Sequence, residues 1–137
     1  MKLSILLALL IILKSALAET IQIEFTDNDS YSIEVAHINI GDTVEWLPEN
    51  EGHNVEFLAG PDMSALPNNS RINEFHSITF KTPGVYLYGC TPHLNMGMLG
   101  LIVVDNNFQN LEKVNTVELS YVANSVVDRL IKIAQSK

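Results

Sequence analysis

Apolar and polar residues alternate along much of the first hundred residues, and this pattern predicts short β-strands. The alternating or continuously apolar runs fall at residues 20–25, 31–35, 43–47, 54–58, 76–80, 85–89 and 99–104, with turn-forming residues between them. Residues 60–71 are rich in Pro, Asn and Ser, so we expect an irregular segment there, with one helical turn at residues 62–66. Seven or eight short strands separated by turns predict an all-β fold, a Greek-key β-sandwich.

The C-terminal part of the chain has a different pattern, which predicts two α-helices. Residues 107–114 and 121–135 contain no Pro or Gly, and in the second segment Val122, Val126, Leu130 and Ile133 recur at helical spacing. Ser120 stands immediately before that segment, and its side chain is expected to cap the helix N-terminus. The sequence has no internal repeat and no linker, so we expect residues 19–137 to form one domain with residues 107–136 as its helical extension.

The first eighteen residues are typical of an export signal. Lys2 precedes an apolar run at residues 3–13 that only Ser4 interrupts, and residues 16–18 give the small-x-small pattern of a signal-peptidase site. A transmembrane anchor is the alternative, but about eleven apolar residues are too few to span about 30 Å of hydrocarbon as a helix. We therefore expect residues 1–18 to be cleaved after Ala18 and the domain to reach the periplasm.

The composition is acidic, with 16 Asp and Glu against 8 Lys and Arg and a formal net charge of −8. Cleavage would remove Lys2 and Lys14 and make the domain more acidic still. Such a charge disfavours binding to nucleic acid and stable association with an anionic membrane. Cys90 is the only cysteine and cannot form an internal disulfide. Because a free thiol is vulnerable in an oxidising compartment, a bound metal is its simplest occupant.

Metal-ligating side chains gather between residues 89 and 98. Cys90 is followed by His93, Met96 and Met98, and His53 stands on a turn between two predicted strands. One thiolate, two imidazoles and a weak thioether form the set that favours a copper electron-transfer centre. Zinc fits less well because structural zinc sites usually close with four strong Cys or His donors. Taken alone, Cys90 would be interpreted as a buried structural thiol.

The spacing Cys90-x2-His93-x4-Met98, with Gly52-His53-Asn54 upstream, resembles the cupredoxin (type I blue copper) family. Thr91-Pro92-His93 followed by Met96-Gly97-Met98 is most similar to the pseudoazurin branch. The resemblance implies one copper ion bound by His53, Cys90, His93 and a methionine. It also implies that Asn54 braces the cysteine loop and that Pro92 stiffens it.

The axial methionine is either Met96 or Met98. In the resembled families the axial Met is followed by one residue, a Gly and a β-branched strand, and Met98-Leu99-Gly100 followed by residues 101–104 fits that pattern. Met98 is therefore the predicted ligand, and Met96 is expected to pack beside His93.

The resemblance implies a one-electron shuttle rather than an enzyme. Such a ligand set leaves no open coordination position, and the sequence shows no Ser/His/Asp set or paired carboxylates converging on it. In the family, the second histidine of the set is the electron port and protrudes through an apolar surface. The residues available here to form that surface are Pro92, Leu94, Met96 and Leu99. His37 and His76 are interpreted as solvated surface groups.

The charge around the predicted port departs from the pseudoazurin pattern. Glu51 and Gly89 stand where that branch commonly has lysines, so a basic docking ring is hard to build. We therefore expect a monomer whose partner is a basic redox protein, either a c-type cytochrome or a copper-containing reductase. Three other functions remain open at this point: copper delivery, a redox enzyme with an open metal position, and a metal-free adhesion sandwich.

Overall fold

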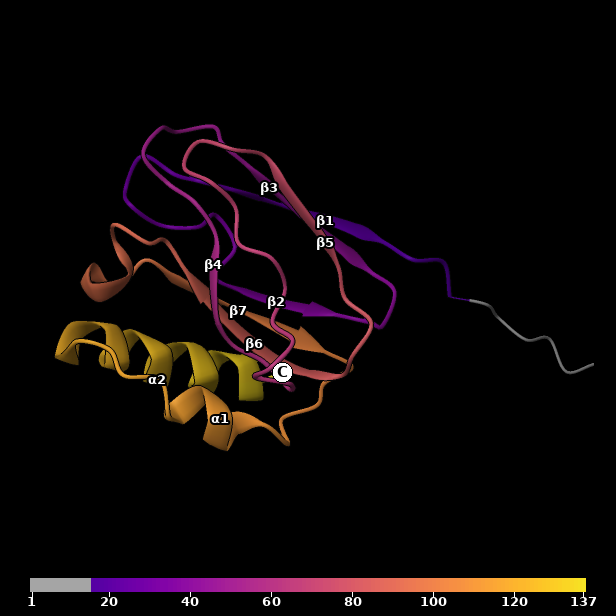
Figure 1. The fold of residues 1–137 in the computed structure, drawn as a ribbon. Coiled ribbons are helices and arrows are strands. Elements are labelled where there is room, and N and C mark those ends of the chain that lie inside the picture. Colours follow the sequence, from indigo (N-terminus) through magenta and orange to yellow (C-terminus); the bar gives the residue numbers. More distant parts are fainter. Residues whose placement is uncertain (1–15) are drawn as a thin grey trace, which may run out of the picture.

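A computed structural model of the protein describes residues 16–137, in which two β-sheets and a layer of helices are stacked (Figure 1). The strands are β1 (Thr20–Glu24), β2 (Val35–Ile38), β3 (Thr43–Leu47), β4 (Glu56–Ala59), β5 (His76–Thr79), β6 (Gly84–Gly89) and β7 (Leu99–Val104). The 3₁₀ helix η1 (Leu94–Met96) lies between β6 and β7, and the helices α1 (Leu111–Asn115) and α2 (Tyr121–Gln135) follow. Most of the predicted signal segment, residues 1–15, lies outside the described residues.

The strands form one sheet in the order β1-β3-β5 and a second in the order β2-β7-β6-β4. The pairs β1–β3 and β2–β7 are parallel, and the other neighbours are antiparallel. Neighbours that are not consecutive in sequence are typical of Greek-key connections. The predicted sandwich with helices at its C-terminus is therefore confirmed.

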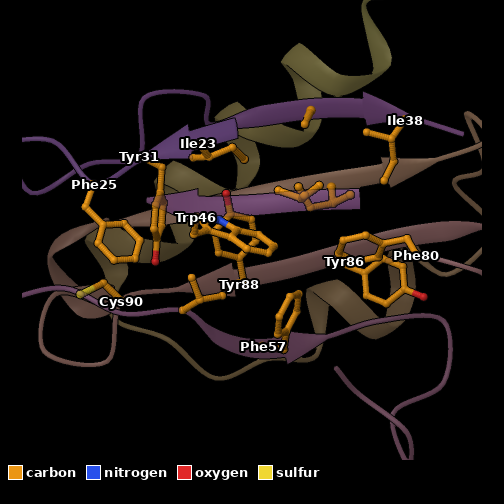
Figure 2. Packing of buried hydrophobic residues seen from close by; sticks show 14 of the residues in the cluster. Ile23, Phe25, Tyr31, Ile38, Trp46, Phe57, Phe80, Tyr86, Tyr88 and Cys90 are labelled. Carbon is orange, nitrogen blue, oxygen red and sulfur yellow. The ribbon is translucent and has the colours of Figure 1, made fainter. Parts of the chain in front are cut away.

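The strands β6 and β7 are buried on both faces, which explains why their sequences are continuously apolar. One face of this pair packs toward the smaller sheet around Trp46, Phe57 and Tyr88 (Figure 2). The other face packs against the helices, where Leu101 and Leu130 belong to the same apolar cluster. The ends of β6 and β7 are thus fixed from both sides, and the predicted metal ligands lie just beyond them.

The helix α1 is shorter than predicted and begins at Leu111 rather than at residue 107. Asn110 is the reason, because its side-chain oxygen accepts from the Val85 N–H at 2.8 Å and its side-chain NH₂ donates to the Val85 carbonyl at 2.8 Å. These bonds tie Asn110 to the start of β6. The helix can therefore begin only after it.

The predicted N-cap of α2 is confirmed, since the Ser120 hydroxyl accepts from the Ala123 N–H at 3.1 Å. Of the four residues at helical spacing, Val122 and Ile133 are exposed. The buried side chains of α2 are Ala123, Val127, Leu130 and Ala134. These residues also recur three and four positions apart, and the two alanines let the helix lie close to β7 and β2. None of the helices in residues 16–137 is long and apolar enough to cross a membrane.

The segment before β2 also differs from the prediction of a strand at residues 31–35. Tyr31 forms only an isolated bridge with Phe25, and the ladder of β2 begins at Val35. Residues 27–30 form a tight loop between Phe25 and Tyr31, with the Thr26 N–H donating to the Ser30 carbonyl at 2.9 Å. The helical turn predicted at residues 62–66 is reduced to a turn in which the Ala65 N–H donates to the Asp62 carbonyl at 3.2 Å.

Candidate metal centre

Cys90 directly follows β6 and begins a loop that folds back on itself before β7. Its backbone N–H donates to the Met98 carbonyl at 3.1 Å, and the Met98 N–H donates to the His93 carbonyl at 3.2 Å. The His93 N–H donates to the Cys90 carbonyl at 2.9 Å, and Gly97 (φ 101°) ends the turn in a left-handed conformation. Antiparallel pairing of β6 with β7 holds both ends of the loop, so Cys90, His93 and Met98 are presented together at one edge of the larger sheet.

His53 reaches the same place from the loop between β3 and β4. Gly52 (φ 90°) turns the chain, and its N–H donates to the Asn73 side-chain oxygen at 2.6 Å. The Asn73 N–H donates in turn to the His53 carbonyl at 2.9 Å. His53 is buried despite its place in a loop. Its backbone is therefore held from a third segment of the chain, and its ring faces inward.

The donor atoms of His53, Cys90 and His93 converge on one point. The two Nδ1 atoms are 3.2 Å apart, and Cys90 Sγ lies 3.7 Å from the Nδ1 of His53 and 3.5 Å from that of His93. A point equidistant from the three atoms is about 2.0 Å from each, close to the metal–imidazole bond length and somewhat shorter than a metal–thiolate bond. Two imidazoles and one sulfur around a single point suit copper.

The two candidate methionines lie in different surroundings. Met98 is 1% exposed and belongs to the same buried cluster as Cys90, whereas Met96 is 64% exposed. Because Met98 is buried in the cluster that contains Cys90, its thioether is available as a weak fourth donor. Burial therefore favours Met98 over Met96, as the sequence pattern did.

Asn54 links the histidine loop to the cysteine loop. Its side-chain oxygen accepts from the Thr91 N–H at 2.7 Å, and its side-chain NH₂ donates to the Thr91 hydroxyl at 2.8 Å. The Tyr31 hydroxyl donates to the Asn54 carbonyl at 2.7 Å. Three segments are thus bonded through Asn54 immediately beside Cys90, which is the bracing geometry that the resemblance implied.

An aromatic shell covers the interior side of the site. Phe25 meets the His53 ring edge-on, with ring centroids 6.0 Å apart. Tyr31 packs on Tyr88 with centroids 4.8 Å apart. Figure 2 shows Cys90 at one end of the row of core side chains, with Phe25 and Tyr31 above it. The sulfur therefore lies between an apolar core and the loops that carry the histidines.

Burial disfavours the charged forms of Cys90 and His53 in the metal-free site. Burial raises the pKa of the Cys90 thiol, an effect that backbone N–H groups of Asn54 and His93 partly offset. Burial also lowers the pKa of His53, as does the neighbouring His93 ring, and Asp29 partly opposes these effects. A thiol that holds its proton must release it when the sulfur becomes a thiolate ligand.

The surface around His93 agrees only in part with the predicted apolar patch. Pro92 and Met96 are exposed and Leu94 is partly exposed, but Leu99 is buried beneath them and contributes nothing to the surface. The His93 side chain is 23% exposed. The prediction was therefore wrong for Leu99, whose place in the buried strand β7 excludes it.

Two carboxylates beside the candidate ligands were not predicted from the sequence. Asp29 lies beside both histidine rings, and Glu56 accepts from the Thr91 hydroxyl at 2.9 Å. Asp29 lies in a predicted turn and Glu56 in a predicted strand, and no sequence motif marks either residue. His37 and His76 were correctly separated from the site, but each is half buried on a strand rather than fully solvated.

The fold and the site together define a small copper-binding β-sandwich protein. A model of the copper-binding proteins of the plastocyanin/azurin family matches residues 18–105. The chain belongs to this family, and copper is its cofactor.

Sequence and structure comparisons both point to pseudoazurins. A protein of Rhizobium leguminosarum bv. viciae with the provisional name pseudoazurin is 41% identical over 91 residues, covering 66% of this chain and 58% of its own. The pseudoazurin of Paracoccus pantotrophus is 34% identical and covers 64% of this chain and 61% of its own. The structure of a Sinorhizobium pseudoazurin superimposes with a TM-score of 0.77 at 30% identity, covering 86% of this chain and 98% of that one. The sequence matches thus span about 60% of these two curated relatives.

Proposed function

We propose that this protein is a blue copper electron carrier in which His53, Cys90, His93 and Met98 bind the metal. The observation that supports this best is the convergence of three donor atoms from two loops, at separations of 3.2 to 3.7 Å, with the buried Met98 at the end of the cysteine loop. The copper ion would supply a Cu(I)/Cu(II) couple. The protein residues hold the donors in place before the metal arrives.

A rigid ligand set serves one-electron transfer because little has to move when the charge on the metal changes. The hydrogen bonds of the cysteine loop and the Asn54–Thr91 pair supply that rigidity. His93 is the ligand with an exposed edge, flanked by Met96 and Pro92, so it is the proposed exit for the electron. Four protein donors leave no position for a substrate, and we propose that the protein has no enzymatic turnover.

The charges at this end of the molecule favour a basic partner. Asp29 and Glu56 border the site, and Glu51 lies on the histidine loop, while Arg71 is the basic residue on the neighbouring loop. A c-type cytochrome or a copper-containing reductase with a positive docking face would complement these carboxylates. The association rate should fall steeply with added salt, whereas a salt-independent rate would reject the proposed charge pairing.

We further propose export to the periplasm as a monomeric domain that starts at Glu19. The Glu19 N–H donates to Asp42 at 2.8 Å, and the Glu19 carbonyl accepts from the Thr43 N–H at 2.9 Å. The chain is therefore bonded to the sheet from this residue onward. The mass of the exported protein would test the cleavage, and an N-terminus other than Glu19 would reject it.

The ligand assignment is tested by comparing copper-loaded wild type with Cys90→Ser, Met98→Leu and Met96→Leu. We expect an intense blue absorption that reduction reversibly bleaches, lost in Cys90→Ser and altered in Met98→Leu. Met96→Leu is the matched control and should keep the wild-type spectrum and potential, because Met96 is exposed. A colourless, redox-silent wild type would favour copper delivery instead.

A further inference from the structure

A carboxylate faces both imidazoles of the copper site from the side opposite Cys90. Asp29 Oδ1 lies 3.7 Å from His53 Nε2 and 3.9 Å from His93 Nε2. The Nδ1 atoms of the same rings face the sulfur. The distances from Asp29 are too long for hydrogen bonds but short enough for direct electrostatic interaction. One negative charge therefore acts on both histidines at once.

The loop that carries Asp29 is built to hold this position. Its ends are joined by the bridge between Phe25 and Tyr31 and by a contact of 2.6 Å between the hydroxyl oxygens of Thr26 and Ser30. Asp29 itself has a φ of 52°, a left-handed conformation that Asp tolerates better than most residues.

The residues at the two ends of this loop also contact the site. Phe25 packs against the His53 ring, and the Tyr31 hydroxyl donates to the Asn54 carbonyl. The loop is thereby fixed to the histidine loop at two points. The backbone at Asp29 is therefore held next to the two histidine rings.

We propose that Asp29 is a positioning residue that shifts the copper couple toward Cu(II). This rests on the proposed function, because it requires His53 and His93 to be ligands. A fixed negative charge near the ligands stabilises the doubly charged ion more than the singly charged one. The acid also stands near the free N–H that a metal-bound imidazole presents, and such outer partners tune the metal that the ring binds.

The expected effect is moderate because the Asp29 side chain is 48% exposed and water screens its charge. We expect Asp29→Asn to change the Cu(II)/Cu(I) equilibrium about three- to tenfold in favour of Cu(I). This corresponds to a rise of about 30–60 mV in the reduction potential, since tenfold is 59 mV for one electron.

The test compares the reduction potentials of copper-loaded wild type, Asp29→Asn, Asp29→Glu and Asp27→Asn at low ionic strength. Asp27 is exposed on the same loop, so Asp27→Asn removes the same charge without removing the carboxylate that faces the rings. Only Asp29→Asn should raise the potential appreciably. The visible spectrum of each variant reports whether the ligand set is intact.

Equal potentials for Asp29→Asn and Asp27→Asn would overturn the inference while leaving a blue, redox-active wild type untouched. If Asp29→Asn loses its blue colour, Asp29→Glu decides the matter. Recovery of the colour and potential in Asp29→Glu supports a role for the charge. Loss in both variants shows that the residue shapes the loop and overturns the inference. A wild type without blue colour would instead defeat the proposed function itself.

Discussion

Replacing Asn54 with alanine separates the stability of the sandwich from the geometry of the copper site. The side chain makes two hydrogen bonds to Thr91, at 2.7 and 2.8 Å, and these join the loops that carry His53 and Cys90. Each such bond contributes about 1 kcal/mol net, so Asn54→Ala should lower the unfolding free energy by about 2 kcal/mol. For a chain of this size that is a fall of roughly 6–10 °C in Tm.

Asn110 provides a matched control at the other end of β6. It also makes two hydrogen bonds, both of 2.8 Å, to the N–H and carbonyl of Val85. These bonds are buried, so Asn110→Ala should cost at least as much stability, about 2–4 kcal/mol. Val85 lies near the beginning of β6, whereas Cys90 follows its end. Asn110→Ala should therefore lower the unfolding free energy without changing the geometry of the copper site.

The two variants are compared by thermal unfolding without copper and by visible spectrum and reduction potential with copper. Both variants should unfold at lower temperature. Only Asn54→Ala should also shift the absorption band and the potential, because only it releases the cysteine loop. If the copper-loaded Asn54→Ala protein has the spectrum and potential of Asn110→Ala, the bracing role of Asn54 is refuted.

Two further predictions concern residues away from the ligands. A Cβ at Gly100 would fall against Cζ of the buried Tyr88 ring and 2.7 Å from its Cε1, so Gly100→Ala should cost about 1–3 kcal/mol of unfolding free energy. A cost below about 0.5 kcal/mol in denaturant titration would contradict this packing. Burial, followed by the charge of Lys137, lowers the pKa of His37 below 6.5, so the unfolded chain takes up this proton at higher pH than the folded chain. The unfolding free energy of the copper-free protein should therefore fall as the pH drops below about 6.5. The unfolding free energy of the His37→Gln variant should fall less steeply over the same range. An unchanged pH profile would show that His37 does not contribute.

The parts of the structure that the sequence predicts well are those with a strong local signal. The strand β7 has the predicted bounds because a continuous apolar run between a glycine turn and polar residues specifies both ends. Cys90, His93 and Met98 were also recognisable as a set, since they belong to one short loop whose spacing carries the information. His53 was harder to recognise as a candidate ligand. Only its neighbours Gly52 and Asn54 distinguish it from His37 and His76 in the sequence.

The wrong predictions concern residues whose roles depend on distant partners. Asn110 was assigned to a helix because nothing near it in sequence shows that its amide binds Val85, 25 residues away. The buried face of α2 could not be read from the sequence, because two overlapping sets of residues recur three and four positions apart. Only contact with β7 and β2 selects the set that contains the alanines. Local propensity describes the element, but tertiary packing selects its face.

Asp29 shows the same limit at the functional site. In the sequence its loop is an ordinary turn of Asp, Asn and Ser. Asp29 is 24 residues from His53 and 64 residues from His93, although its carboxylate lies near both rings. Its position depends on Phe25 and Tyr31, which face inward because each belongs to the aromatic core. The core therefore sets the electrostatics of the site as well as its shape, since it fixes the place of a charge that no motif marks. It follows that variants with the same four candidate ligands but a different loop at residues 26–30 should have the same colour as the wild type and a different reduction potential.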